Sequence, residues 1–251
     1  MCLIVFALNA HPEWDLVVAA NRDEFYQRPA AIANYWADKP HILGGRDLAA
    51  RGTWLAVDAR GRFAALTNVR HQDRSDMPSS RGELVTHFLD SHHTPEHFHD
   101  AIETDLYGGY NLILDDGQYA WYHSNRYPSR ALTPGIYGLS NAELNSDWPK
   151  VTSSVADFKH ALASDNIEEA LFSLLQDEAA AEDEHLPDTG VGIALERMLS
   201  PRFICTPDYG TRVSTVLLRN RERLIFIERQ HMPEGDTVRF ELTRQNSGTF
   251  G

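Results

Sequence analysis

The chain has 251 residues, of which 42% are hydrophobic, so it is long and apolar enough to bury a substantial core. Its formal net charge of −13 argues against nucleic-acid binding through phosphate contacts, and its two cysteines are too few for a disulfide framework. No stretch rich in Pro, Gly or Ser interrupts it, and we therefore expect a single domain over residues 1–251.

The N-terminal stretch is a short apolar run that begins with a thiol, Cys2-Leu3-Ile4-Val5-Phe6-Ala7-Leu8. It is too short to span a membrane, and no basic region precedes it as in a signal peptide. We therefore expect a protein that does not span a membrane, in a cytoplasmic, reducing location where Cys2 stays a thiol.

Cys2 combines two chemical functions if Met1 is removed. Its thiol would act as a nucleophile, and its own α-amine would take the thiol proton. An α-amine has a pKa of about 7.7–8.0, which suits a general base at neutral pH. The alternative interpretation is that Cys2 is a buried residue that behaves as a small hydrophobe.

A second stretch is predicted to lie beside the first. Leu16–Ala20 reads as a strand after a turn, so a hairpin would bring the polar run Asn21-Arg22-Asp23-Glu24 next to the start of the first strand. Folding alone gives no reason for four polar residues there. The alternative is that Arg22 and Asp23 form a structural ion pair beside the hairpin.

The next segment is predicted to be irregular from Tyr35 to Ile42, with a tight turn at Gly44-Gly45. No Gly-Lys-Ser/Thr follows these glycines, so they do not indicate a phosphate-binding loop. Strands are expected over residues 53–58 and 63–68, and the second ends in Asn68, which would act either at a site or in a turn.

Two helices are predicted after these strands. Ser80 and Glu83 have the spacing of a capping box, and Thr94-Pro95 indicates a second helix start. Four histidines lie around the joint of these helices: His92, His93, His97 and His99. Because Pro95 breaks any helical register between them, we expect a solvated corner rather than a metal site, and no metal or cofactor.

The remaining chain alternates blocks of strands and helices. Strands are predicted at 110–114, 118–123, 130–132, 136–140, 214–218, 224–229 and 238–242. Helices are predicted at 148–162, after Asn166, and within 190–199, with an acidic loop over 178–184. The strand at 136–140 ends in Asn141, a further amide side chain at a strand end.

Antiparallel runs of strands at both ends of the chain, with helices in two blocks between them, disfavour a parallel sheet. The pattern predicts an α+β fold, a four-layer α-β-β-α sandwich of two mostly antiparallel sheets.

Three motifs carry a resemblance to a known family. They are Met1-Cys2, Asn21-Arg22-Asp23-Glu24, and Tyr209-Gly210-Thr211-Arg212-Val213-Ser214-Thr215. Together they resemble the NRDE family, the family of the transport and Golgi organisation 2 protein. That family is similar in turn to the N-terminal nucleophile (Ntn) cysteine hydrolases, such as penicillin V acylase and bile salt hydrolase, which implies the same sandwich fold.

The resemblance also implies a site. Cys2 would be the nucleophile, Asp23 would hold its amine, and Arg212 would lower the thiol pKa. Asn68 and Asn141 would donate to the oxyanion, and the remaining residues would shape the pocket: Asn21, Arg22 and Glu24. One position departs from the Ntn cysteine hydrolases, because Ala20 stands where they have an Arg three residues before the Asp.

Two functions follow, and the sequence leaves both open. One is a hydrolase that cleaves a linear amide C–N bond in a small-molecule substrate. The other is a non-catalytic protein that binds or moves an apolar ligand such as haem or a lipid, to which the NRDE family is linked. Several aromatic residues would line the pocket of such a carrier: Trp14, Phe25, Tyr26, Tyr35 and Trp36. The oligomeric state is not determined by the sequence.

Overall fold

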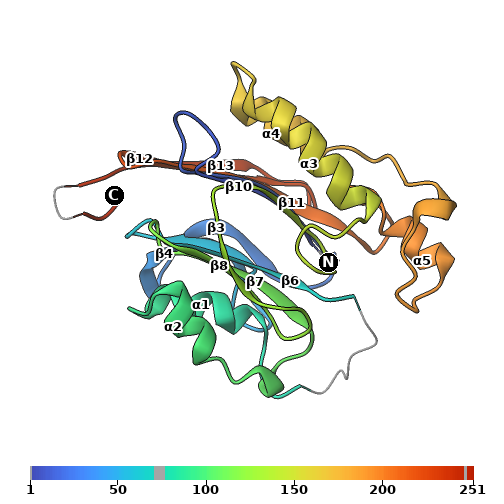
Figure 1. Ribbon diagram of the computed structural model, residues 1–251, viewed down its shortest axis with the longest axis horizontal. Coiled ribbons are helices and arrows are strands. Elements are labelled where there is room, and N and C mark those ends of the chain that lie inside the picture. Colours follow the sequence, from blue (N-terminus) through green and yellow to red (C-terminus); the bar gives the residue numbers. More distant parts are fainter. Residues whose placement is uncertain (1, 71–76, 246–247) are drawn as a thin grey trace.

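The computed structural model describes residues 2–70, 77–245 and 248–251. Two antiparallel sheets stack face to face, and helices cover the outer face of each sheet (Figure 1). This four-layer α-β-β-α arrangement confirms the predicted fold class.

The first sheet has six strands in the order β10-β1-β2-β11-β12-β13. Their bounds are β1 (Cys2–Leu8), β2 (Leu16–Phe25), β10 (Gly135–Leu139), β11 (Tyr209–Arg219), β12 (Arg223–Gln230) and β13 (Thr237–Thr243). The predicted N-terminal hairpin therefore lies inside a sheet, with β10 on one side and β11 on the other.

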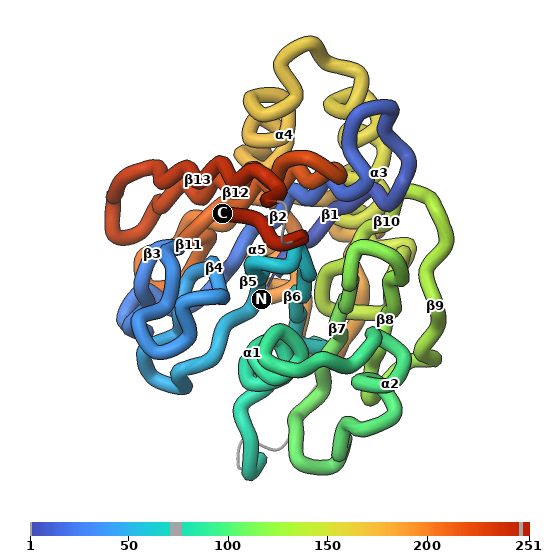
Figure 2. The backbone as a smooth tube through the Cα atoms, turned by 90° about the vertical axis from the view of Figure 1, so that its left-hand side faces the viewer, coloured from blue at the N-terminus to red at the C-terminus, as the bar shows by residue number. Residues whose placement is uncertain are grey.

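The second sheet has seven strands that follow the chain order, β3-β4-β5-β6-β7-β8-β9. Their bounds are β3 (Ala30–Trp36), β4 (Lys39–Asp47), β5 (Leu55–Asp58), β6 (Phe63–Asn68), β7 (Tyr110–Asp115), β8 (Ala120–Ser124) and β9 (Arg130–Leu132). Figure 2, viewed at a right angle to Figure 1, shows the later strands of this sheet, β6, β7, β8 and β9, following one another in this order.

The helices lie on the outer faces. Helices α1 (Gly82–Asp90) and α2 (Pro95–Asp100) cover the second sheet, and α3 (Pro149–Leu162) and α4 (Ile167–Leu175) cover the first (Figure 1). The short α5 (Ile193–Met198) lies at the end of the sandwich near the N-terminus. None of the helices in the described ranges has the length and apolar character needed to cross a membrane.

Strand β1 is buried on both faces, which explains its uninterrupted apolar sequence. Successive residues of a strand point to opposite faces. Cys2, Ile4 and Phe6 pack in the core between the sheets, whereas Leu3 and Val5 pack in the core under α3 and α4. The thiol therefore belongs to the inter-sheet side of the first sheet.

The prediction for the segment around Tyr35 was wrong. It is not irregular up to Ile42, because it belongs to the paired strands β3 and β4, whose pairing has register shifts. Gly44 and Gly45 lie inside β4 rather than in a tight turn. A Cβ on Gly44 would lie 2.7 Å from the backbone oxygen of Leu55, so glycine permits the close approach of β5. Bulged strands lack the strict alternation that a sequence pattern reveals.

The predicted starts of α2 and α4 are confirmed, whereas the predicted start of α1 is not. Thr94 accepts from the His97 N–H at 3.3 Å at the start of α2, and Asn166 accepts from the Glu169 N–H at 3.4 Å at the start of α4. The capping box at Ser80 was wrong, because α1 begins after Arg81, whose side chain makes no capping bond.

Within the described ranges, no cluster of three or more His, Cys, Asp or Glu side chains could hold a metal ion. Instead, His99 Nδ1 lies 2.6 Å from Nδ1 of the buried His123, whose Nε2 lies 2.8 Å from the Tyr110 hydroxyl.

Candidate active site

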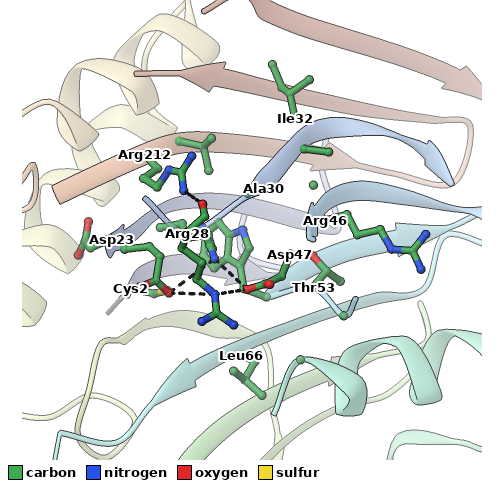
Figure 3. A pocket seen from close by; sticks show the side chains of 18 of the residues that line it. Cys2, Asp23, Arg28, Ala30, Ile32, Arg46, Asp47, Thr53, Leu66 and Arg212 are labelled. Carbon is green, nitrogen blue, oxygen red and sulfur yellow. Dashed lines mark hydrogen bonds and ion pairs between the residues drawn. The ribbon is translucent and has the colours of Figure 1, made fainter. Parts of the chain in front are cut away.

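A pocket opens where β1 begins, close to the ends of β2 and β6 (Figure 3). Its lining includes Cys2 from β1, Arg22 and Glu24 from β2, Asn68 from β6 and Arg212 from β11. Segments that are far apart in sequence thus meet at one end of the two sheets.

Strand pairing brings the three sequence motifs together. Cys2 lies opposite Arg22 in the β1–β2 pairing, and Asp23 lies opposite Thr211 in the β2–β11 pairing. The β2–β11 register shifts between Thr211 and Val213, which leaves Arg212 as the extra residue of a bulge. The bulge lies beside the pocket, where it re-aims the Arg212 side chain.

The Cys2 side chain reaches the pocket from the inter-sheet core, and the residue is 7% exposed. Burial raises the pKa of the thiol to about 11, and the charge of Arg22 acts in the opposite direction. The sulfur is therefore protonated at neutral pH. Because the thiolate is the nucleophile, attack by Cys2 requires a base that removes this proton.

Asp23 lies next to Arg22 on β2 but points to the opposite face of the strand. Its Oδ1 accepts a hydrogen bond from the Thr211 hydroxyl at 2.7 Å, and its Oδ2 lies 3.9 Å from Lys150 Nζ. Burial raises the pKa of Asp23, and the charge of Lys150 and the Thr211 hydrogen bond lower it. In Figure 3 the Asp23 carboxylate points away from Arg28 and Asp47.

The two asparagines predicted for the oxyanion lie together at the end of β6. Asn68 lines the pocket, and its backbone carbonyl accepts from the Asn141 side-chain amide at 2.7 Å. The side-chain oxygen of Asn141 accepts from the Ser140 hydroxyl at 3.2 Å. The same hydroxyl lies 3.0 Å from the backbone carbonyl of Cys2, to which it also donates. Asn141 and Ser140 together therefore link the end of β6 to the start of β1.

Arg212 lines the pocket wall, but its guanidinium is held by backbone carbonyls. Its Nε donates to Met232 at 3.0 Å, and another nitrogen donates to the carbonyls of Phe25 and Arg28. These bonds tie Arg212 to three loop and strand ends. Among the neighbouring side chains, Arg22 rather than Arg212 lowers the pKa of the Cys2 thiol.

Asn21 faces the layer of helices rather than the pocket. It is fully buried, and its amide donates to the carbonyls of Leu175 and Arg202, both at 2.8 Å. Its oxygen accepts from Ser214 at 2.6 Å. These bonds connect β2 to α4 and to the segment before β11, so Asn21 supports the sheet from its outer side.

Arg22 and Glu24 belong to a cluster of alternating charges in the pocket. Asp47 accepts from Arg28 at 2.6 Å and from Arg22 at 3.4 Å, and Glu24 lies within 4 Å of both arginines, at 3.7 Å and 3.8 Å. Figure 3 shows the links between Asp47 and Arg28. Arg22 therefore pairs with Asp47 and Glu24, and not with Asp23 as in the alternative interpretation of the sequence.

Sequence reasoning missed Lys150, Arg28 and Asp47. Lys150 follows Pro149 at the start of α3, a position that reads as solvent-exposed in sequence, yet its side chain is 4% exposed. Arg28 and Asp47 are separated in sequence and meet only through the β3–β4 hairpin. Thr211 was signalled, because it lies within the motif at Tyr209–Thr215.

The aromatic residues expected around an apolar ligand do not gather at this pocket. Trp14 is buried at the far end of the β1–β2 hairpin, where Arg223 lies over its ring. Trp36 is buried and donates to the Gly44 carbonyl at 3.0 Å. Phe25 contacts Tyr209 and Tyr35 contacts Phe240, in edge-on geometry.

Two solved structures share this architecture. A Caenorhabditis elegans N-acylethanolamine-hydrolyzing acid amidase ortholog matches with a TM-score of 0.54 and 11% identity, over 86% of this chain and 92% of that one. The C2A mutant of a Clostridium perfringens conjugated bile acid hydrolase matches with a TM-score of 0.54 and 7% identity, over 96% and 92%. The chain therefore shares the fold of these two structures.

Sequence relatives cover nearly the full chain. The human "Transport and Golgi organization protein 2 homolog" is 35% identical over 276 residues, 98% of this chain and 100% of that protein. The mouse homologue is 33% identical over 96% of each chain, and the Drosophila melanogaster protein is 26% identical over 91% of each. The model of the family described as transport and Golgi organisation 2 matches residues 1–233, and the chain belongs to this family.

Proposed function

We propose that this protein is an N-terminal-cysteine hydrolase that cleaves a linear amide C–N bond with Cys2 as its nucleophile. One observation carries the proposal: the first residue of β1 is a thiol that lines a pocket, with the buried carboxylate of Asp23 on the neighbouring strand.

The buried thiol needs a base, because its pKa is raised to about 11. Removal of Met1, which lies outside the described residues, would leave the α-amine of Cys2 within reach of its own sulfur. The pKa of an α-amine, about 7.7–8.0, lets the neutral amine accept the thiol proton near neutral pH. Asp23 orients the resulting ammonium by its negative charge.

The reaction runs in two halves. The amine takes the thiol proton as sulfur attacks the amide carbonyl, and the N–H groups of Asn68 donate to the oxyanion. The ammonium then gives its proton to the leaving nitrogen as the C–N bond breaks. Water, deprotonated by the same amine, attacks the thioester carbonyl. The C–S bond then breaks, the ammonium returns its proton to sulfur, and the acid product leaves.

The supporting roles follow from the contacts. Asn141 holds the end of β6 through the Asn68 carbonyl and so positions the oxyanion donor. Arg212 fixes the pocket wall through the carbonyls of Phe25, Arg28 and Met232. Arg22 and Glu24 shape the pocket, whose substrate is a small molecule, while Asn21 supports β2 from the helix side.

Intact mass and covalent labelling test the proposal. We expect the purified protein to lack Met1, and a small activated ester to acylate Cys2 faster than the exposed Cys205. Asp23→Asn should lower the rate of Cys2 acylation by about 10²-fold, the size of effect seen when one group that stabilises catalytic charge is removed.

Cys205→Ser is the matched control and should leave the Cys2 rate unchanged. Retained Met1, or equal labelling of both thiols in the folded protein, would contradict the proposal. Haem or lipid binding that survives Cys2→Ala would then favour the carrier function instead.

A further inference from the structure

We propose that Lys150 is a positioning residue of this site: its ammonium keeps the buried Asp23 carboxylate charged, so that Asp23 can hold the base that activates Cys2. This inference rests on the proposed function, because it assigns a role within the same site.

Lys150 occupies an unusual place for a lysine. It lies in the first turn of α3, just after Pro149, and its side chain is 4% exposed. Lysine is almost never fully buried unless it is paired, and the positive end of a helix dipole disfavours a cation in the first turn. Its ammonium makes no hydrogen bond to any described residue. Local folding thus gives no reason for Lys150, and a charge partner must offset its burial.

Asp23 is that partner. Lys150 Nζ lies 3.9 Å from Asp23 Oδ2, and the Asp23 side chain is fully buried. A separation of 3.9 Å is that of an ion pair without a direct N–H bond. Lys150 therefore acts on Asp23 through its charge while the carboxylate keeps its hydrogen bond from Thr211.

Other groups act on this pair from each neighbouring element. Arg70, which follows β6, adds a second positive charge near Asp23, and Tyr209 and Cys2 face it from β11 and β1. The α-amine of Cys2 would be a further cation there. Arg70 itself is paired with the buried Glu196 of α5, and its guanidinium lies over the ring of Trp148, two residues before Lys150.

Lys150 is the group that most strongly opposes the effect of burial on the pKa of Asp23. Burial raises the pKa of Asp23, and the Lys150 charge is the largest influence that lowers it. In the other direction, burial lowers the pKa of Lys150 to about 8, and Asp23 opposes that change. Without the ammonium, Asp23 would take up a proton at a higher pH and lose the charge that orients an amine.

The pH profile of Cys2 acylation tests this role in the full-length protein. Lys150→Met should move the acid midpoint of the rate upward by about one pH unit or more, the usual size of a nearby opposite charge on a carboxyl pKa. Lys150→Arg retains the charge and should keep the midpoint near that of the wild type. A Lys150→Met profile that is lower at every pH but has an unmoved midpoint would overturn the inference.

A second readout separates this inference from the proposed function. In ¹³C-aspartate-labelled Cys2→Ala protein, the Asp23 carboxyl signal, assigned by its loss in Asp23→Asn, should titrate below pH 7 with Lys150 present and at higher pH in Lys150→Met. This NMR measurement does not depend on turnover. If it shows the shift but wild-type Cys2 is never acylated, the proposed function fails and the charge role of Lys150 stands.

The NMR experiment also covers a variant that does not fold. Should Lys150→Met be unstable, the Asp23 titration in the Cys2→Ala protein with Lys150 intact remains decisive. A midpoint above pH 7 there would mean that Lys150 does not keep Asp23 charged at neutral pH, and it would overturn the inference.

Discussion

A buried acid–base pair lies near each end of strand β11, and the two pairs are built differently. At the far end, Arg219 donates to the buried Asp115, to Asp15 at 2.8 Å and to the Gly61 carbonyl at 2.8 Å. At the pocket end, Thr211 bonds to Asp23, whose cation Lys150 stays 3.9 Å away. Direct hydrogen bonds join Arg219 to its carboxylates, and we call this the closed pair. Lys150 and Asp23 lack such a bond, and we call them the open pair.

The difference follows from the chemistry of the two cations. The rigid fork of arginine satisfies several acceptors at once and keeps its proton at any working pH. Asp115 and Asp15 raise the pKa of Arg219 still further. A lysine ammonium is a point charge whose pKa falls on burial, so its pair with Asp23 remains sensitive to protonation. The closed pair suits a structural role, and the open pair suits a site where protons move.

Breaking the closed pair should have the largest effect on stability. Arg219→Met leaves Asp115 and Asp15 without their cation, and we expect a loss of about 3–5 kcal/mol in the free energy of unfolding, measured by urea denaturation. The rate of Cys2 acylation in the remaining folded protein should not change, because the pair lies at the opposite end of β11.

Arg239→Met is the matched control for this prediction. Arg239 pairs with Glu168 at 2.6 Å on the surface, where its side chain is 42% exposed. A surface pair of this kind contributes about 0–1 kcal/mol. If Arg219→Met and Arg239→Met lowered the free energy of unfolding by similar amounts, the closed pair would contribute no more to stability than a surface pair.

Glu228 is a third buried carboxylate, and it differs from Asp115 and Asp23 because its hydrogen bonds come from neutral donors. It accepts from the Ala33 N–H at 2.7 Å and from the Thr215 hydroxyl at 3.3 Å. Burial raises the pKa of Glu228 from 4.5 to about 7. The folded state thus favours protonated Glu228, and the stability this gives is complete below pH 4.5 and is lost as the pH rises through about 7.

Glu228→Gln should therefore remove part of the fall in unfolding free energy between acidic and neutral pH. At one pKa unit per 1.36 kcal/mol, the gain at pH 8 is at most roughly 3 kcal/mol. Chemical denaturation of the wild type and the variant at pH 5 and pH 8 measures it. The same pH slope in both proteins would contradict the prediction.

Thr211→Val should give the smallest change, at the open pair itself. It removes one hydrogen bond to the Asp23 carboxylate, which is worth about 1.5 kcal/mol, and should slow Cys2 acylation about tenfold at the acid end of its pH profile. The rate of acylation as a function of pH is the measurement.

Thr215→Val is the control for that substitution, because Thr215 lies on the same strand but donates to Glu228. It should leave the acylation profile unchanged. Equal slowing by both valine variants would point to a general disturbance of β11 rather than to Asp23.

The sequence by itself determined the layered fold and the convergence of the main motifs. The apolar runs at Cys2–Leu8 and Leu16–Ala20, with polar residues directly after the second, are local patterns that specify a buried hairpin with a polar end. Asn68 was also placed correctly at a strand end that reaches the pocket.

Only the tertiary structure decided which polar residues act together. Strand alternation alone does not reveal that Asn21 bonds to Leu175 and Arg202, or that a bulge turns Arg212 toward backbone carbonyls. Lys150 reads as a surface lysine until α3 packs on the sheet and carries it beside Asp23. Burial and long-range contact set the charge state of these groups, and neither is encoded in the spacing of neighbouring residues.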